Sequence, residues 1–214
     1  SDVDVNSYLN LTTLNVLEGS RLTHGDNSDS DLYRINITAV NVTVDSSSSI
    51  DVLSMGYAGQ NGLGKGTATD SGGSYGGTGG GTNLGPYGSI ISPLDLGSGG
   101  QDAAGDGGGV VFINISDTLN LTGFISANGT SKNGAGSGGS IYLITDKFIG
   151  DGNIQSTGGR TSISGDSAGG GGRIAVYYNS NSFTGVIKAL GGASTASTEN
   201  RGGGGTIYLK DRNY

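Results

Sequence analysis

The sequence predicts an all-β protein, a parallel β-helix (a solenoid) with coils of about 30–33 residues and long glycine-rich loops. Three observations predict it. Glycine accounts for 45 of the 214 residues, about three times its usual share of roughly 7%. No stretch shows the 3.6-residue apolar period of an amphipathic helix. Short segments of alternating apolar and polar residues recur at a nearly constant spacing, which indicates a stacked repeat.

The clearest repeat is a glycine pair followed by a short apolar strand. It occurs as GGVVFI (108–113), GGSIYLI (138–144), GGRIAVY (171–177) and GGTIYL (204–209). The last glycines before these strands are 30, 33 and 33 residues apart. A second motif follows the first three copies, as GFISANG (123–129), GNIQSTGG (152–159) and GVIKALGG (185–192). A unit of this size cannot bury its own core, so we expect equivalent strands of successive units to pair in parallel.

Alternation within the repeats assigns the inward side chains. The expected ladders are Val111, Ile141, Ile174 and Ile207; then Ile113, Leu143, Val176 and Leu209; then Ile125, Ile154 and Ile187. Between the first two ladders lies an outward column of Phe112, Tyr142, Ala175 and Tyr208. Its aromatic members Phe112, Tyr142 and Tyr208 form a candidate contact stripe. The alternatives are that another segment covers this stripe, or that it binds a neighbouring subunit or sugar rings.

The chain is predicted to be a single domain, 1–214. Residues 1–56 would supply the N-terminal strands and a first coil, with core positions Ile35, Ile37, Val42, Val44, Ile50 and Val52. Residues 108–214 hold the regular coils. Residues 57–107 are a Gly/Ser-rich stretch that contains both prolines. Its composition alone is typical of a linker, whereas the alternative is an insertion folded over the flank of the coils.

The order of these motifs resembles a glycine-rich β-helical module found in large secreted and cell-surface proteins of protists, bacteria and some animals. The segments that carry the resemblance are GGSYGG (72–77), YGSIISPLDLGSGG (87–100), LNLTGFISANG (119–129), GSGGSIYL (136–143), GGGGRIAVYY (169–178) and GGGGTIYLK (202–210). It covers roughly residues 55–210. More loosely, the chain is similar to autotransporter-type adhesin stalks. The resemblance implies a right-handed β-helix, an extracellular setting and a structural role, and it carries no catalytic residues.

The charge and the hydrophobic content of the chain limit the kinds of partner that it is expected to bind. The net charge is −7 and the 11 Lys and Arg residues are scattered singly, so no basic patch predicts binding to nucleic acid. No run of about 18 apolar residues predicts a membrane span. The chain has no cysteine and begins at Ser1 rather than Met, as expected of a processed chain or a fragment.

Six N-x-[ST] sequons predict N-glycosylation of an extracellular or cell-surface protein. They begin at Asn10, Asn36, Asn41, Asn114, Asn120 and Asn128. In FINIS (112–116) and TLNLT (118–122) the asparagines alternate with aliphatic residues, so both should face outward when the aliphatics face the core.

Motifs for cofactors and metals are weak. His24 is the only histidine, and Ser20, His24 and Asp26 are neighbours in a polar loop rather than a fixed triad. Asp26, Asp29 and Asp31 have spacings that a Ca²⁺ loop could use, but the full loop pattern is absent. An incidental Ca²⁺ site and a solvated turn are the two interpretations. GQNGLGKG (59–66) lacks the Ser or Thr of a phosphate loop, so no cofactor is predicted.

Pairs of carboxylates that could cleave polysaccharides are a further possibility in the sequence. The candidates are Asp102 with Asp106 and Asp146 with Asp151, with Arg160 or Arg173 as base or charge stabiliser. A catalytic site needs such groups to converge on one groove, and these fall in different turns without a repeated column. The sequence therefore predicts no enzyme.

The predicted function is that of a structural subunit of an extracellular filament or cell-surface appendage. The Thr206–Leu209 strand lies close to the end of the repeat array and could pair with an N-terminal strand of another copy, which gives a head-to-tail homopolymer. The alternative is a carbohydrate-binding adhesin stalk that uses the tyrosine-rich flank. A polysaccharide lyase or hydrolase is the third and weakest hypothesis.

Overall fold

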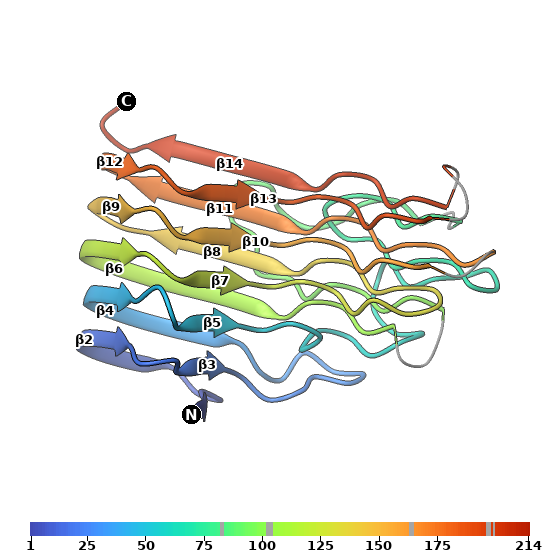
Figure 1. Cartoon of the computed structure of the whole chain (residues 1–214), viewed down its shortest axis with the longest axis horizontal. Coiled ribbons are helices and arrows are strands. Elements are labelled where there is room, and N and C mark those ends of the chain that lie inside the picture. The colour runs from blue at the N-terminus through green and yellow to red at the C-terminus, as the bar shows by residue number, and fades with distance from the viewer. Residues whose placement is uncertain (82–83, 102–104, 163–164, 196–197, 199) are drawn as a thin grey trace.

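The computed structural model describes residues 1–81, 84–101, 105–162, 165–195, 198 and 200–214, which form an all-β fold without helices (Figure 1). The strands are β1 (Asp2–Asp4), β2 (Leu9–Val16), β3 (Arg21–Thr23), β4 (Ile35–Val44), β5 (Ser49–Asp51), β6 (Val110–Leu121), β7 (Phe124–Ser126), β8 (Ser140–Ile144), β9 (Lys147–Gly150), β10 (Asn153–Gln155), β11 (Arg173–Tyr178), β12 (Ser180–Phe183), β13 (Val186–Lys188) and β14 (Thr206–Asp211). The all-β class is confirmed.

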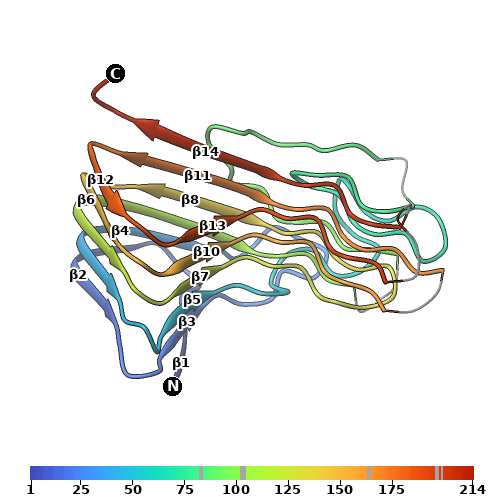
Figure 2. The ribbon, with the colours of Figure 1, turned by 45° about the horizontal axis from the view of Figure 1, so that its top comes forward.

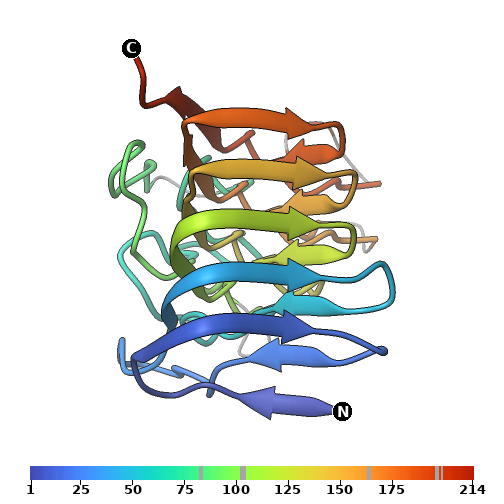
Figure 3. The same ribbon diagram turned by 90° about the vertical axis from the view of Figure 1, so that its left-hand side faces the viewer.

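The strands form two parallel sheets that the chain visits in turn. The small sheet has the order β1-β3-β5-β7-β10-β13. The large sheet has the order β12-β9-β6-β8-β11-β14, and β4 joins it by pairing with β6 and with β2. The term layer is used here for a set of consecutive strands that passes once through both sheets, such as β8, β9 and β10. Figure 3 shows these layers stacked in sequence order from the N-terminal end to the C-terminal end.

The register of the strands is the one that the repeat predicts. Ile174 pairs with Ile141 on one side and with Ile207 on the other, and Ile154 lies in the same way between Ile125 and Ile187. The interior ladder residues are completely buried, as are the six core positions predicted for residues 1–56. Full burial of each aliphatic side chain contributes about 1.5–3 kcal/mol to folding, so the ladders offset the entropy lost by the glycines.

Glycine-rich loops extend from the strands toward the other end of the molecule and run in contact with one another (Figure 2). Part of the 57–107 segment lies among them. Gly77 N donates to Gly171 O at 2.8 Å, and Gly170 N donates to Gly73 O at 2.9 Å. The segment also buries Tyr75 and Leu96 completely. The described residues of 57–107 therefore pack against the loops of the later layers.

Close contact explains the glycine runs before β11 and β14. A Cβ on Gly172 would overlap Gly139 O of the preceding layer and Ser156 Oγ. At the equivalent run before β14, Gly204 has open space around its Cβ position. Gly204 is the counterpart of Gly171 one layer below, whose Cβ position lies 2.5 Å from Gly205 N of the following layer. Gly204 lies in the last described layer and has no such neighbour.

We expect Gly172→Ala to destabilise the fold by about 1–3 kcal/mol, the usual cost of overpacking. Gly204→Ala is the matched control, and we expect it to be neutral or mildly stabilising because alanine reduces the freedom of the unfolded chain. Chemical denaturation of the two variants measures the difference. Equal stabilities would contradict this explanation of the glycine runs.

Candidate functional site

An aromatic ladder runs along the outer face of the large sheet. The ring centroids of Phe112 and Tyr142 are 5.1 Å apart, those of Tyr142 and Tyr177 are 5.7 Å apart, and those of Tyr177 and Tyr208 are 5.6 Å apart. The sequence predicted Phe112, Tyr142 and Tyr208 but missed Tyr177. Tyr177 lies two residues after Ala175 on the same outward side of β11, so the alternation that placed Ala175 could have found it.

Part of the 57–107 segment crosses this face; the stretch that holds Tyr87 and Ile91 is called the strap below. Tyr177 Oη donates to Ile91 O at 2.9 Å, and Arg173 Nε donates to Tyr87 O at 2.8 Å. Ala175, the gap in the predicted stripe, is completely buried. The four ladder rings nevertheless remain half-buried rather than covered, and Ile91 is 54% exposed. The outer face of the large sheet is therefore buried at Ala175, while the four aromatic rings stay partly accessible to solvent.

The two sheets end in strand edges that have no partner among the described residues. At the C-terminal end these are β12 and β14 of the large sheet and β13 of the small sheet, and at the N-terminal end they are β2 and β1. Ile207 and Leu209 are 44% and 46% exposed, although Ile174 and Val176, one layer below, are fully buried. Val3 at the N-terminal end is 52% exposed. Both ends present ladder side chains that lack their next neighbour.

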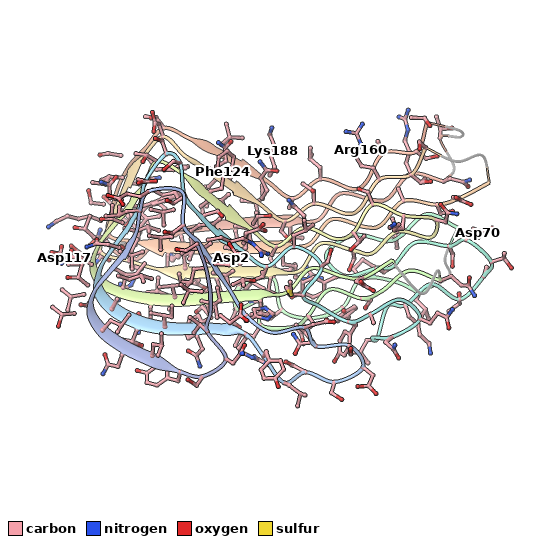
Figure 4. All side chains as sticks on the ribbon, turned by 60° about the horizontal axis from the view of Figure 1, so that its bottom comes forward. Asp2, Asp70, Asp117, Phe124, Arg160 and Lys188 are labelled. Atoms are coloured by element: carbon pink, nitrogen blue, oxygen red, sulfur yellow. The ribbon has the colours of Figure 1, made fainter. Side chains whose placement is uncertain are left out.

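A polar groove lies between the loop tips of successive layers. It has a volume of about 530 Å³ and is lined by Ser131, Lys132, Asn133, Arg160, Thr161, Ser162 and Thr195. A second hollow of about 370 Å³ shares Arg160 and adds Lys188. Neither lining contains Asp or Glu. Figure 4 shows Arg160 on the loop side of the molecule, far from Asp117 at the strand end.

The described carboxylates among the candidates for polysaccharide cleavage do not converge in this groove. Asp102 lies outside the described residues. Asp106 Oδ1 accepts from Gly59 N at 2.9 Å, and Asp146 Oδ1 accepts from Asn179 Nδ2 at 2.6 Å. Asp106, Asp146 and Asp151 are all absent from the linings of both hollows.

Arg173, the other cation weighed for catalysis, is buried on the large sheet. It lies 5.4 Å above the Tyr75 ring and donates to Thr206 Oγ1 at 3.1 Å, in addition to its bond with Tyr87 O. These contacts compensate the desolvation of its charge. Arg173 therefore fastens the strap to β11 and to β14, a structural role that the sequence did not predict.

His24 is buried inside the fold, and its two ring nitrogens contact backbone atoms rather than the side chains of Ser20 or Asp26. Its Nδ1 lies 2.7 Å from Gly25 O, and its Nε2 lies 3.2 Å from Val110 N. A neutral ring with the proton on Nδ1 satisfies both contacts, because Nε2 must accept from the Val110 N–H. Burial is the main cause that lowers the His24 pKa, and the hydrogen bond with Gly25 O is the main effect that opposes it. The Arg34 charge lowers the pKa further, while Asp31 and Asp26 raise it.

The three aspartates of the candidate Ca²⁺ loop each bind a local partner. Asp26 Oδ1 accepts from Ser28 N, Asp29 Oδ1 accepts from Ser30 Oγ, and Asp31 forms an ion pair of 2.7 Å with Arg34. Across the described part of the chain, no group of three or more His, Cys, Asp or Glu side chains is arranged to hold a metal ion.

The six sequons differ in accessibility. Asn10 and Asn114 are exposed on β2 and β6, while Asn36, Asn41 and Asn120 are half-buried. Asn128 is also half-buried, and both ends of its amide are engaged. Its Nδ2 donates to Ser126 Oγ, and its Oδ1 accepts from Thr157 N and Thr157 Oγ1. Asn10 and Asn114 are thus the most accessible of the predicted acceptors.

Comparison with family models, with curated proteins and with solved structures found no match for this chain. Among the described residues, no helix has the length and apolar character needed to cross a membrane. The surfaces described above therefore carry the evidence for function.

We expect His24 to make stability pH-dependent. The unfolded chain takes up a proton on its single histidine below about pH 6.5, while burial holds the ring neutral in the folded state. The unfolded state then binds more protons, so the free energy of unfolding should fall as the pH drops below 6.5, by up to about 1.4 kcal/mol per pH unit until the folded pKa is reached. Above pH 6.5 the ring is neutral in both states and contributes no slope.

Thermal unfolding between pH 5 and pH 7.5 measures this effect. His24→Gln should be less stable at pH 7.5 but should lose the slope between pH 5.5 and 6.5. An unchanged slope in the variant would show that other groups cause it.

Proposed function

We propose that this chain is a structural subunit of an extracellular filament or cell-surface appendage, with no catalytic activity. Its strands would form a right-handed parallel β-helix, and its copies would stack head to tail. One observation carries this proposal. Each sheet ends in unpaired strand edges within the described chain, and the ladder residues there, such as Ile207 and Leu209, are nearly half exposed. Such edges are templates for pairing with another chain.

The interior layers support head-to-tail stacking rather than a contact between like ends. All pairings between named strands are parallel, and the inward ladders keep their positions from layer to layer. A further layer added at β14 in the same sense would repeat a contact that already exists between β11 and β14. Because such a contact joins two different surfaces and need not close into a ring, it generates a filament.

The accessible sequons support the proposed extracellular setting. The sequons at Asn10 and Asn114 lie exposed on strands, where a glycan would not disturb the core. The absence of catalysis is proposed because a lyase or hydrolase needs carboxylates that converge on a groove, and the linings of the two described hollows contain none.

The aromatic ladder favours a second candidate, a carbohydrate-binding adhesin stalk. Half-exposed rings spaced 5.1–5.7 Å apart offer apolar faces with polar edges on which sugar rings could stack. Tyr142→Ala should then abolish binding on a glycan array, while Tyr8→Ala, on a tyrosine outside the ladder contacts described, should not. A wild-type chain that binds no glycan above background would exclude this candidate.

The test of filament formation uses the open end at β14. Leu209→Lys should raise the concentration needed for assembly by about tenfold or more, because a lysine in a buried contact must lose its water. Leu63→Lys is the matched control, since Leu63 is a 72% exposed leucine in the 57–107 segment, and we expect it to assemble like the wild type. Sedimentation velocity and negative-stain micrographs are the measurements. A wild-type chain that stays monomeric at every concentration would contradict the proposal.

A further inference from the structure

We infer that the tyrosines of the aromatic ladder form a site of oxidative coupling, at which a one-electron oxidant joins two neighbouring rings into dityrosine. Tyr177 is the central member, and it couples with Tyr142 on β8 or with Tyr208 on β14. The new bond joins two successive layers of the large sheet covalently. Because it forms inside one copy of the chain, the inference does not depend on the proposed filament.

The first argument is that three phenol rings converge around Ala175. Ala175 pairs in register with Tyr142 and with Tyr208, so these two tyrosines lie in one outward column with only a methyl group between them. The ring centroid of Tyr177, two residues further along β11, lies 5.7 Å from that of Tyr142 and 5.6 Å from that of Tyr208. Aromatic rings at such distances are in contact, so radicals on two of them meet without diffusion.

The second argument concerns the residues that an oxidant can attack. The chain has ten tyrosines but no Trp, no Cys and a single Met, and Cys and Met are residues that oxidants commonly modify. The one methionine, Met55, packs against the hydrophobic core. Tyr142, Tyr177 and Tyr208 are only half-buried, so each is partly accessible to an oxidant. Oxidation of the folded chain is therefore directed to its tyrosines.

The third argument is that the surroundings restrict coupling to β8, β11 and β14. Phe112 contacts Tyr142 from the preceding layer, but it has no phenol oxygen and forms no phenoxyl radical. A separate pair, Tyr75 and Tyr87, has ring centroids 4.8 Å apart. Tyr75 is fully buried, however, and its Oη is hydrogen-bonded to Ser140 Oγ at 2.7 Å. Among the described residues, the ladder is thus the contact between tyrosines in which both rings are reached from solvent.

The reaction balances with hydrogen peroxide as the oxidant and a haem peroxidase as its catalyst. Each of the two phenols gives up one electron and one proton and becomes a phenoxyl radical. A carbon–carbon bond then forms between a ring carbon beside the C–O carbon of one tyrosine and its equivalent in the other. The hydrogen on each of these carbons moves to the neighbouring oxygen, which restores both phenols. The protein loses two hydrogen atoms, and these convert one hydrogen peroxide into two waters.

Oxidation of the folded protein with peroxidase and hydrogen peroxide tests the inference. After denaturing electrophoresis the single-chain band should show dityrosine fluorescence, and peptide mass mapping should find Tyr177 joined to Tyr142 or to Tyr208, with two hydrogen atoms lost. Tyr177→Phe keeps the ring but removes the phenol, so it should lose the dityrosine of this band. Tyr142→Phe and Tyr208→Phe should each retain the bond of the other pair, and the double variant should retain neither.

Tyr33→Phe is the matched control, because Tyr33 is half-buried like Tyr177 and belongs to none of the ring pairs of the described chain. It should couple like the wild type. A bond between residues 35 or 31 positions apart also restricts the unfolded chain. The oxidised wild type should therefore unfold at a temperature about 5–10 °C higher than the untreated protein, and oxidised Tyr177→Phe should show no such rise.

Dityrosine that persists at the wild-type level in Tyr177→Phe, or that maps to Tyr75 and Tyr87, would overturn the inference. So would a folded wild type whose single-chain band gains no dityrosine under conditions that couple free tyrosine. Dityrosine found only in larger species would show that copies couple with one another and that the ladder does not. Since the readout is the single-chain band, a chain that forms no filament contradicts the proposed function and leaves this test intact.

Discussion

The backbone hydrogen bonds between successive layers fix the rest of the structure. They set each strand in register with the one before it, so that Ile174 can only lie between Ile141 and Ile207. They also bring the glycine-rich loops so close that Gly172 leaves no space for a Cβ beside Gly139 O. The ladders and the aromatic face both follow from this register, because a shift by one residue would turn every inward side chain outward.

The buried polar side chains His24 and Arg173 form hydrogen bonds with backbone atoms of the same fold. His24 uses both ring nitrogens on backbone partners, one of them the Val110 N–H at the start of β6. Arg173 bonds Tyr87 O and lies over the Tyr75 ring. Each joins an element that stands outside the regular repeat to the large sheet. Burial makes such contacts costly to break, which explains why two residues that look reactive in the sequence are fixed in structural roles.

The sequence predicted the ladders because period-two alternation depends only on neighbouring residues. It predicted three members of the aromatic ladder for the same reason, and it missed Tyr177 because the ladder changes column at Ala175, where the strap reaches over β11. The bond between Tyr177 Oη and Ile91 O joins residues 86 positions apart. The groove around Arg160 was missed as well, since its lining comes from loop tips in different layers. Contacts between segments without a common repeat leave no local pattern to recognise.

An open β-sheet edge is normally protected against association, most often by charged residues. Here the charges on the small sheet differ in sign between the ends, with Asp2 and Asp4 on β1 and Lys188 on β13. Asp2 lies 3.5 Å from Arg21, whereas Asp4 has no ion pair among the described residues. Two N-terminal ends, or two C-terminal ends, would bring like charges together, but an N-terminal end and a C-terminal end would not. In the proposed filament, these charges would disfavour contact between like ends and favour head-to-tail contact, the direction in which the parallel strands inside the molecule already run.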